Sequence, residues 1–243
     1  MLPDMARSPT SPGKSAASAG ARDRPRRADA ERNREALVTA ARTVFERDGF
    51  VAARVTDIAD TAGVAHGSFY SHFQSKEDVF AAVLAEVEED MLHPGPWPGP
   101  WPALTAGSDP VAVIEAANVA YLDAYRRNAR LMALLEQVAT VDRDFLELRL
   151  RRSAAFVARN ARAIRRLQRA GLADPALDPE LASLALSAMV SRSAYVTLAV
   201  GRKPVDVGRL AATLTRLWVN GLGIPGPRAA GSADIPPTEP GCP

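Results

Sequence analysis

Apolar residues recur every three or four positions over most of this chain, and no stretch alternates apolar with polar residues at the two-residue period of a β-strand. Leu37, Ala41 and Val44 illustrate the pattern, because they fall on one face of a helix with 3.6 residues per turn. Each such face has to be buried against other helices when no sheet is present. The spacing therefore predicts an all-α fold.

A proline-rich segment divides the helical pattern into two parts. Residues 93–110, HPGPWPGPWPALTAGSDP, hold six prolines, and proline removes a backbone N–H, so this segment can be neither a helix nor a central strand. The two ends of the chain are too poor in large apolar residues to form a core. The expected organisation is a disordered basic tail over 1–29, a first helical domain over 30–92, a loop over 93–109, a second helical domain over 110–223 and a flexible tail over 224–243.

The first helical domain contains two short helices joined by a glycine. Val55 and Ile58 mark one short apolar face, Phe69 lies on the next, and Gly63 stands between them. Glycine readily adopts the positive φ that a tight turn between helices requires. Two such helices within a three-helix unit are typical of the helix-turn-helix, here at about residues 54–73, whose second helix enters the major groove of DNA.

The second helix of this motif and the residues after it carry a surface suited to DNA. Gly67 leaves one position without a side chain, so that the helix can approach another surface closely. Tyr70, His72 and Lys76 offer hydrogen-bond donors nearby. Because half or more of protein–DNA hydrogen bonds go to phosphate and sugar, these donors predict a DNA-binding surface without many arginines.

The composition argues against several other functions. The net charge of +2 does not by itself indicate a nucleic-acid binder. Residues 1–34 carry eight Lys and Arg against four acids, an excess that either adds phosphate contacts or only keeps the tail soluble. Three histidines, one cysteine and the lack of a Gly-rich phosphate loop or GxSxG predict no metal, no cofactor and no enzyme. Since no apolar run suits a membrane span or a signal peptide, we expect a cytoplasmic protein.

Residues 35–84, EALVTAARTVFERDGFVAARVTDIADTAGVAHGSFYSHFQSKEDVFAAVL, resemble the DNA-binding domain of the tetracycline-repressor (TetR) family of transcriptional regulators. The match follows the ordered pattern DIA-x-x-AGV-x-x-G-S-FY-x-HF-x-SKED. The resemblance implies base-edge contacts near the start of the recognition helix and phosphate contacts after it, although packing within the small domain is the alternative for Tyr70 and His72. The residues expected at DNA are Arg54, Thr56, His66, Gly67, Ser68, Tyr70, His72 and Lys76.

The chain departs from the family pattern at the starts of two helices. The family usually has Ser or Thr at the positions of Ala53 and Arg54, and Ser at the position of Ala65, where the hydroxyl caps a helix. Losing such a cap costs about 1 kcal/mol. We expect Arg54 to replace the phosphate contact and Thr56 to cap one turn later. The departures also leave open a helical ligand- or protein-binding module that has lost DNA binding.

The resemblance implies a homodimer that binds a near-palindromic operator, most often as a repressor, and leaves DNA when a small effector binds the second domain; an activator is the alternative. An apolar lining would favour a hydrophobic effector. Aromatic and methionine residues are the candidates for that lining, with ordinary core packing as the alternative. They are Trp97, Trp101, Tyr121, Tyr125, Met132, Phe145 and Phe156.

Two further features of the second domain carry expectations. The stretch from Asp142 to Leu172 has arginines opposite its apolar face, including Arg152 and Arg159, which we interpret as a solvated face. An anionic ligand such as an acyl-CoA is the alternative. The last two helices are apolar enough to pack against a second copy as a four-helix interface. The residues expected there are Leu181, Leu184, Tyr195, Leu210, Leu214 and Trp218.

Overall fold

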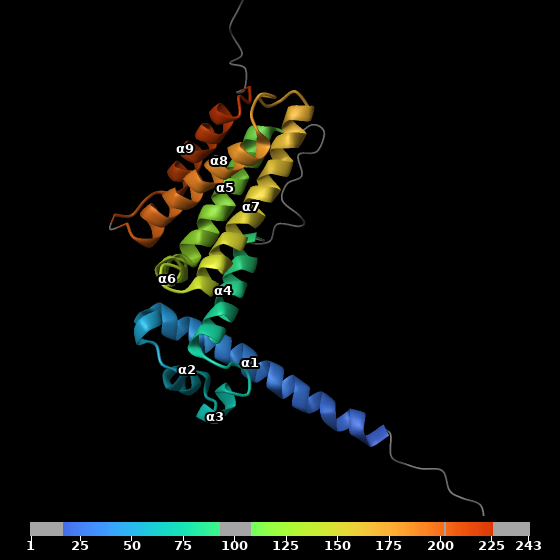
Figure 1. The fold of residues 1–243 in the computed structure, drawn as a ribbon, viewed down its shortest axis with the longest axis vertical. Helices are drawn as coiled ribbons and strands as arrows, with labels where there is room; N and C mark the ends of the chain where they lie inside the picture. The colour runs from blue at the N-terminus through green and yellow to red at the C-terminus, as the bar shows by residue number, and fades with distance from the viewer. Residues whose placement is uncertain (1–16, 93–107, 202, 226–243) are drawn as a thin grey trace, which may run out of the picture. The chain divides into compact units, whose positions relative to one another are not determined.

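The structure is a computed structural model that describes residues 17–92, 108–201 and 203–225, with side chains from residue 28 onward (Figure 1). The described residues form helices joined by short turns and contain no strand, which confirms the all-α prediction. The elements are α1 (Ala17–Ala52), α2 (Val55–Ala62), α3 (His66–Phe69), α4 (Lys76–Leu92), α5 (Pro110–Arg127), α6 (Ala129–Val138), α7 (Arg143–Arg169), α8 (Pro179–Ala194), the π-helical turn η1 (Tyr195–Ala199) and α9 (Val207–Gly221).

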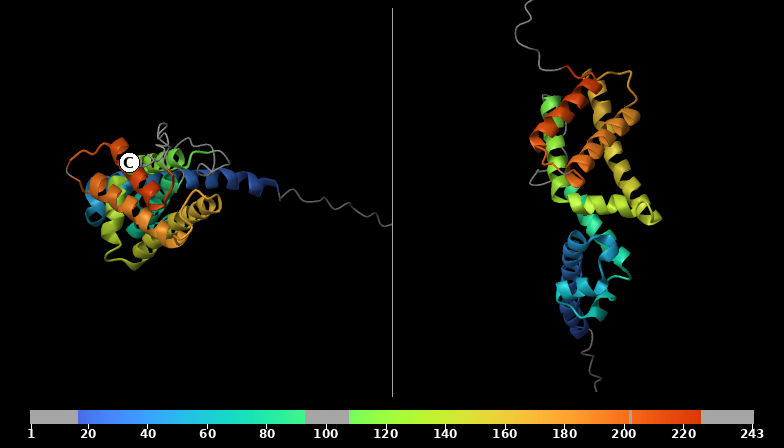
Figure 2. Two further views of the ribbon diagram at one scale, coloured as in Figure 1. Left: turned by 90° about the horizontal axis from the view of Figure 1, so that it is seen from above. Right: turned by 90° about the vertical axis from the view of Figure 1, so that its left-hand side faces the viewer.

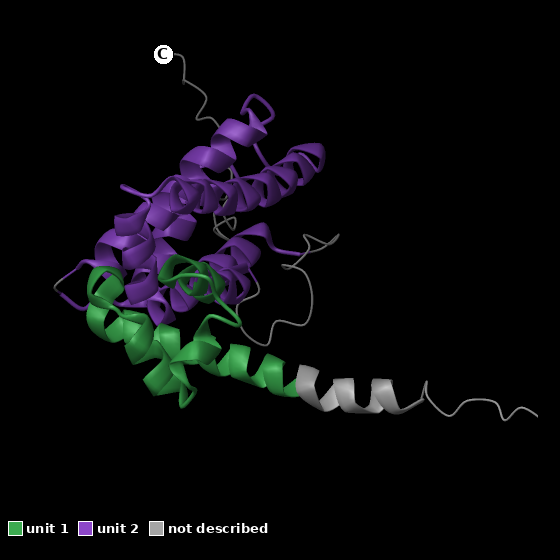
Figure 3. Cartoon of the chain, turned by 60° about the horizontal axis from the view of Figure 1, so that its bottom comes forward, with its two compact units in different colours: residues 1–83 green, residues 84–243 purple. Residues whose placement is uncertain are grey.

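The chain forms two compact units, Met1–Val83 and Leu84–Pro243 (Figure 3). The division falls inside α4, whereas the sequence suggested a boundary at the proline-rich segment. The reason is that the second half of α4 packs within the second unit: Met91 is 1% exposed, and Asp90 pairs with Arg127. Most of the expected loop, residues 93–107, and residues 1–16 and 226–243 of the expected tails lie outside the described residues.

Helix α1 begins earlier than the sequence suggested. Residues 17–29, expected to belong to a disordered tail, are helical. Alanine and arginine are among the strongest helix formers and are frequent here, which favours the extension of the helix towards the N-terminus. Near its other end, Gly49 has a φ of 79° and interrupts the helix. Beyond this point Phe50 lies 5.0 Å from Phe80 of α4, ring centre to ring centre, within the core of the first unit.

Gly63 ends α2 in the left-handed conformation, with a φ of 69°. A Cβ atom built there meets nothing within 4 Å, so the backbone angle, and not space, requires glycine. We expect Gly63→Ala to lower the free energy of unfolding by about 1–2 kcal/mol, the cost of a left-handed residue with a side chain. Urea-induced unfolding followed by circular dichroism measures this effect.

The matched control for this variant is Gly67→Ala in α3. Gly67 has equally open surroundings but no positive φ, so this substitution is expected to leave the free energy of unfolding unchanged or slightly higher. Equal stability of the two variants would contradict the role assigned to the turn.

In the second unit α5 packs against α9, which is far from it in the chain, and α7 packs against the next helix, α8 (Figure 2). Helices α5 and α8 each begin with a proline that follows an aspartate at the N-cap. The carboxylate of Asp109 accepts from the N–H of Val111, and that of Asp178 accepts from the N–H of Leu181. Such caps satisfy donors that the first turn of a helix leaves free.

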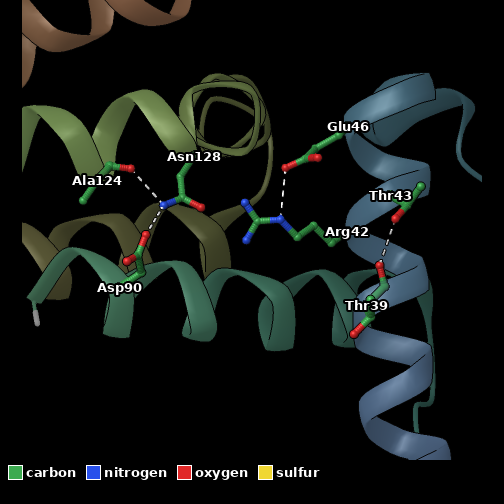
Figure 4. Close-up of polar contacts among 7 residues, drawn as sticks. All are labelled: Thr39, Arg42, Thr43, Glu46, Asp90, Ala124 and Asn128. Carbon is green, nitrogen blue, oxygen red and sulfur yellow. Dashed lines mark hydrogen bonds and ion pairs between the residues drawn. The ribbon is translucent and has the colours of Figure 1, made fainter. Parts of the chain in front are cut away.

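A buried amide fixes the corner between α5 and α6. Asn128 is 1% exposed, and its Nδ2 donates to Asp90 at 2.7 Å and to the carbonyl of Ala124 at 2.9 Å (Figure 4). Arg127 also donates to Asp90, at 2.8 Å. These bonds hold the end of α4 against the corner between α5 and α6.

Candidate nucleic-acid interface and ligand cavity

Helix α3 has one buried face and one exposed face. Phe69 is fully buried, and Phe73 just after the helix is 3% exposed, so these two rings anchor it to the first unit. Tyr70 is 55% exposed, and His66 and Gly67 are exposed as well. The rings of His66 and Tyr70 lie 5.5 Å apart. The exposed face of α3 therefore presents an imidazole, a phenol and a glycine side by side.

The remaining expected DNA contacts differ in exposure. Arg54 and Thr56 are exposed, whereas Ser68 and His72 are half-buried. Lys76, at the start of α4, donates from Nζ to the carbonyl of Val51 at 3.3 Å and lies 4.7 Å from the centre of the Phe50 ring. Lys76 thus ties the end of α1 to α4, a structural role that the sequence did not reveal.

The structure shows how the two helix starts without Ser or Thr are arranged. Arg54 occupies the N-cap of α2 with a φ of −119°, and Ala65 occupies that of α3; neither side chain caps its helix. The expected substitute, Thr56, is not a cap, because it lies inside α2, and its hydroxyl reaches only Asp57, at 3.5 Å. A capping side chain has to belong to the residue that precedes the helical angles.

Side chains cap the start of α4. The hydroxyl of Ser75 accepts from the N–H of Asp78 at 3.1 Å, and the Asp78 carboxylate accepts in return from the N–H of Gln74 at 3.0 Å. Two free donors at the start of α4 are satisfied in this way. The turn that follows α3 is consequently held at both of its ends, by Phe73 and by this cap.

The second unit encloses a cavity of about 390 Å³. Its walls come from α5, α6, α7, α8, η1 and α9. Four of the residues expected from the sequence line it: Tyr121, Tyr125, Met132 and Phe156. The rings of Tyr121 and Phe156 meet edge to face at 5.6 Å.

Three other candidates for the lining fall elsewhere. Phe145 is 4% exposed and does not line the cavity; it points into the core, because it lies at the start of α7, beyond the cavity wall. Trp97 and Trp101 lie outside the described residues. Trp218, expected at a dimer interface, lines the cavity instead.

Most of the surface of the lining is apolar, but several charged groups interrupt it. The lining includes four arginines and one glutamate among its charged residues, together with asparagines and serines. Arg152 is 8% exposed, so the expected solvated arginine face of α7 is wrong at this position. The spacing of the arginines could have predicted their place in the lining, because Arg149, Arg152 and Arg159 recur at helical intervals on the face of α7 that also carries Phe156. The charged lining residues are Glu136, Arg149, Arg152, Arg159 and Arg192.

Burial shifts the acid–base properties of the lining. It raises the pKa of Tyr121 to about 12 and also raises the pKa of Tyr125, so both phenols stay neutral and keep their donor hydrogens. Burial lowers the pKa of Arg152, and it lowers the pKa of Arg159 to about 10 with help from the charge of Arg162. Both guanidinium groups remain charged at neutral pH.

The residues expected at a dimer interface separate into two groups. Leu181 and Leu184 of α8 are 66% and 50% exposed in the single chain, so both side chains are accessible to a second copy. Leu214 and Trp218 are 2% and 8% exposed and belong to the interior, because this face of α9 packs inside the unit; Leu217, 47% exposed, lies on the outer face instead. Tyr195 and Leu210 are half-buried.

Helix α2, Gly63 and α3 form a helix-turn-helix, and this part of the chain matches a known protein family. Residues 37–83 match the family model described as "Bacterial regulatory proteins, tetR family". These residues, within the first unit, therefore resemble the DNA-binding domain of the TetR family of transcriptional regulators.

Individual relatives extend this likeness. The transcriptional repressor BepR of Brucella suis is 32% identical over 105 residues, which are 39% of this chain and 50% of BepR. The match thus spans only half the length of that relative. The transcriptional regulator TtgR of Pseudomonas putida is 28% identical over 67% of this chain and 78% of its own length.

A solved structure shares the whole fold. NalD of Pseudomonas aeruginosa, described as the secondary repressor of the MexAB-OprM multidrug efflux pump, superposes with a TM-score of 0.61 and 23% identity, covering 84% of this chain and 100% of that chain. At this identity the likeness concerns the fold alone.

Proposed function

We propose that the protein is a transcriptional repressor that binds a near-palindromic operator as a homodimer and leaves it when a small effector occupies the cavity. The observation that carries the proposal is the exposed face of α3, where His66, Gly67 and Tyr70 lie on the side opposite the buried Phe69. The name of BepR supports repression over activation. Arg54, Thr56, Ser68, His72 and Lys76 are the further proposed contacts with DNA.

Direct DNA binding tests this function. Fluorescence anisotropy of the full chain on the DNA upstream of its own gene, at two salt concentrations, is expected to give specific binding that survives a scrambled competitor. The affinity should fall as salt rises, because phosphate contacts release counterions. Equal affinity for the scrambled DNA would contradict operator recognition.

The homodimer is supported by exposed apolar residues on α8 and η1. Within the described residues, Pro179–Ala199 is long and apolar enough to cross a membrane by length and composition alone, with a mean hydropathy of 1.3 and 17% of its residues buried inside the chain. One such helix is weak evidence for a membrane span. In a helical regulator of this family, a second copy of the same chain accounts for the exposed leucines.

Introducing negative charges on the exposed face of α8 is expected to dissociate the proposed dimer. The double variant Leu181→Glu, Leu184→Glu should raise the dissociation constant of the dimer roughly 100-fold or more, because unpaired carboxylates would be buried at the interface. Sedimentation velocity measures the change. Val141→Glu is the control, since Val141 is 88% exposed and lies between α6 and α7. A double variant that stays as dimeric as the control would contradict the proposed interface.

A further inference from the structure

The cavity of the second unit carries more positive than negative charge. Its lining holds four arginines and one glutamate. Glu136, the one acid, is already paired with Arg149, at 3.0 Å between Oε2 and Nη1. Arg152 therefore adds positive charge that no carboxylate of the lining offsets at short range.

Arg152 is the most informative of these residues. It is 8% exposed, and its two terminal nitrogens donate to the sulfur of Met132 at 2.8 Å and to the sulfur of Met91 at 2.7 Å. Thioether sulfur is a weak acceptor. Among the described residues no carboxylate comes within ion-pair distance of Arg152, and Glu88 and Glu136 act on it only at longer range.

A buried guanidinium with such weak acceptors is unfavourable in the folded chain. Burying a charge is costly unless it is paired and hydrogen-bonded, and buried arginines are accordingly almost always paired. Arg152 lines the cavity, so an anion that enters the cavity comes close to its guanidinium group. The buried charge of Arg152 thus lacks a carboxylate partner among the described side chains.

We propose that the cavity binds a small organic anion, a carboxylate or sulfonate on an aromatic body, with its charge held by Arg152 and Arg159. This inference rests on the proposed function in that the anion would be the effector. The Tyr121 and Phe156 rings supply the surface for the aromatic body, and the guanidinium of Arg159 lies 4.7 Å from the centre of the Phe156 ring. Anion and ring are therefore recognised next to each other.

The size of the cavity narrows the ligand class. A volume of about 390 Å³ lies near the lower end of the range for small-molecule sites. This volume suits a compact organic anion of about two or three rings.

Two probes that differ only in the anionic group test this inference. 8-Anilinonaphthalene-1-sulfonate carries a sulfonate, and N-phenyl-1-naphthylamine is the same ring system without it. Fluorescence titration of the full chain is expected to show that the sulfonate probe binds roughly tenfold more tightly or better, as a charge-assisted hydrogen bond predicts. Equal affinity for the two probes would overturn the proposal.

Variants locate the binding site. Arg152→Met is expected to weaken binding of the sulfonate probe roughly tenfold or more and to leave the neutral probe unaffected. Arg151→Met is the matched control, because Arg151 is exposed, does not line the cavity and removes the same charge. Arg159→Met provides a second variant should the first fail to fold. Sulfonate binding that is unchanged in the cavity variants, or that falls equally in the control, would refute the site.

These titrations contain no DNA. Equal binding of the two probes would therefore refute the proposed anion site without bearing on the proposal of operator binding. A failed operator assay beside a positive titration would remove only the proposed regulatory function.

Discussion

Replacing Gly67 with leucine is expected to abolish specific operator binding and to leave the fold intact. A Cβ atom at Gly67 meets nothing within 4 Å, so a side chain has room within the protein, and the helix itself favours leucine over glycine by about 1 kcal/mol. On DNA the same side chain would hold α3 away from the base edges. We expect the operator affinity to fall roughly 100-fold or more, which corresponds to about 2.8 kcal/mol.

Two measurements separate the effects of this substitution. Fluorescence anisotropy gives the operator affinity, and urea-induced unfolding gives the stability of the same preparation. Gly67→Ala adds a single methyl group and should cause a smaller loss of affinity in the same direction. Operator binding by the leucine variant at the wild-type level would show that α3 does not approach the bases at this position.

The first unit was predictable from sequence because its determinants are local. Gly63 ends α2 through its own φ, and Ser75 caps α4 through a residue three positions later. Local determinants of this kind also set two helix starts in the second unit, where the carboxylates of Asp109 and Asp178 bind N–H groups within three residues. Such features depend only on neighbours in the chain, so they can be identified from a single sequence.

The second unit was less predictable because its determinants are distant contacts. An amphipathic pattern shows that a helix has two faces, but not which face meets a neighbouring helix and which remains outside. Leu214 and Trp218 were expected outside on this ground and are buried, whereas Leu217 is exposed. Likewise Arg152 belongs to a stripe that looks solvated until Met91 and Met132, from other helices, are placed beside it.

Replacing Arg152 with methionine is expected to raise the free energy of unfolding of the ligand-free protein. Methionine fills a similar space and interacts well with the neighbouring thioethers, and it removes the desolvation of a buried guanidinium. Replacement of buried charges by apolar residues of similar volume stabilises proteins by roughly 1–4 kcal/mol, and we expect a gain in the lower half of that range. Urea-induced unfolding at one fixed protein concentration measures it, since the stability of a dimer depends on concentration.

The exposed neighbour again supplies the control. Arg151→Met should change the free energy of unfolding by less than about 0.5 kcal/mol, as is usual for a surface substitution. If Arg152→Met destabilises the protein relative to Arg151→Met, then Arg152 serves the fold and is not held in readiness for a ligand. If it stabilises the protein and also weakens binding of the sulfonate probe, one side chain opposes folding and favours binding. Residues that are retained for a ligand, at the expense of the empty fold, show that combination.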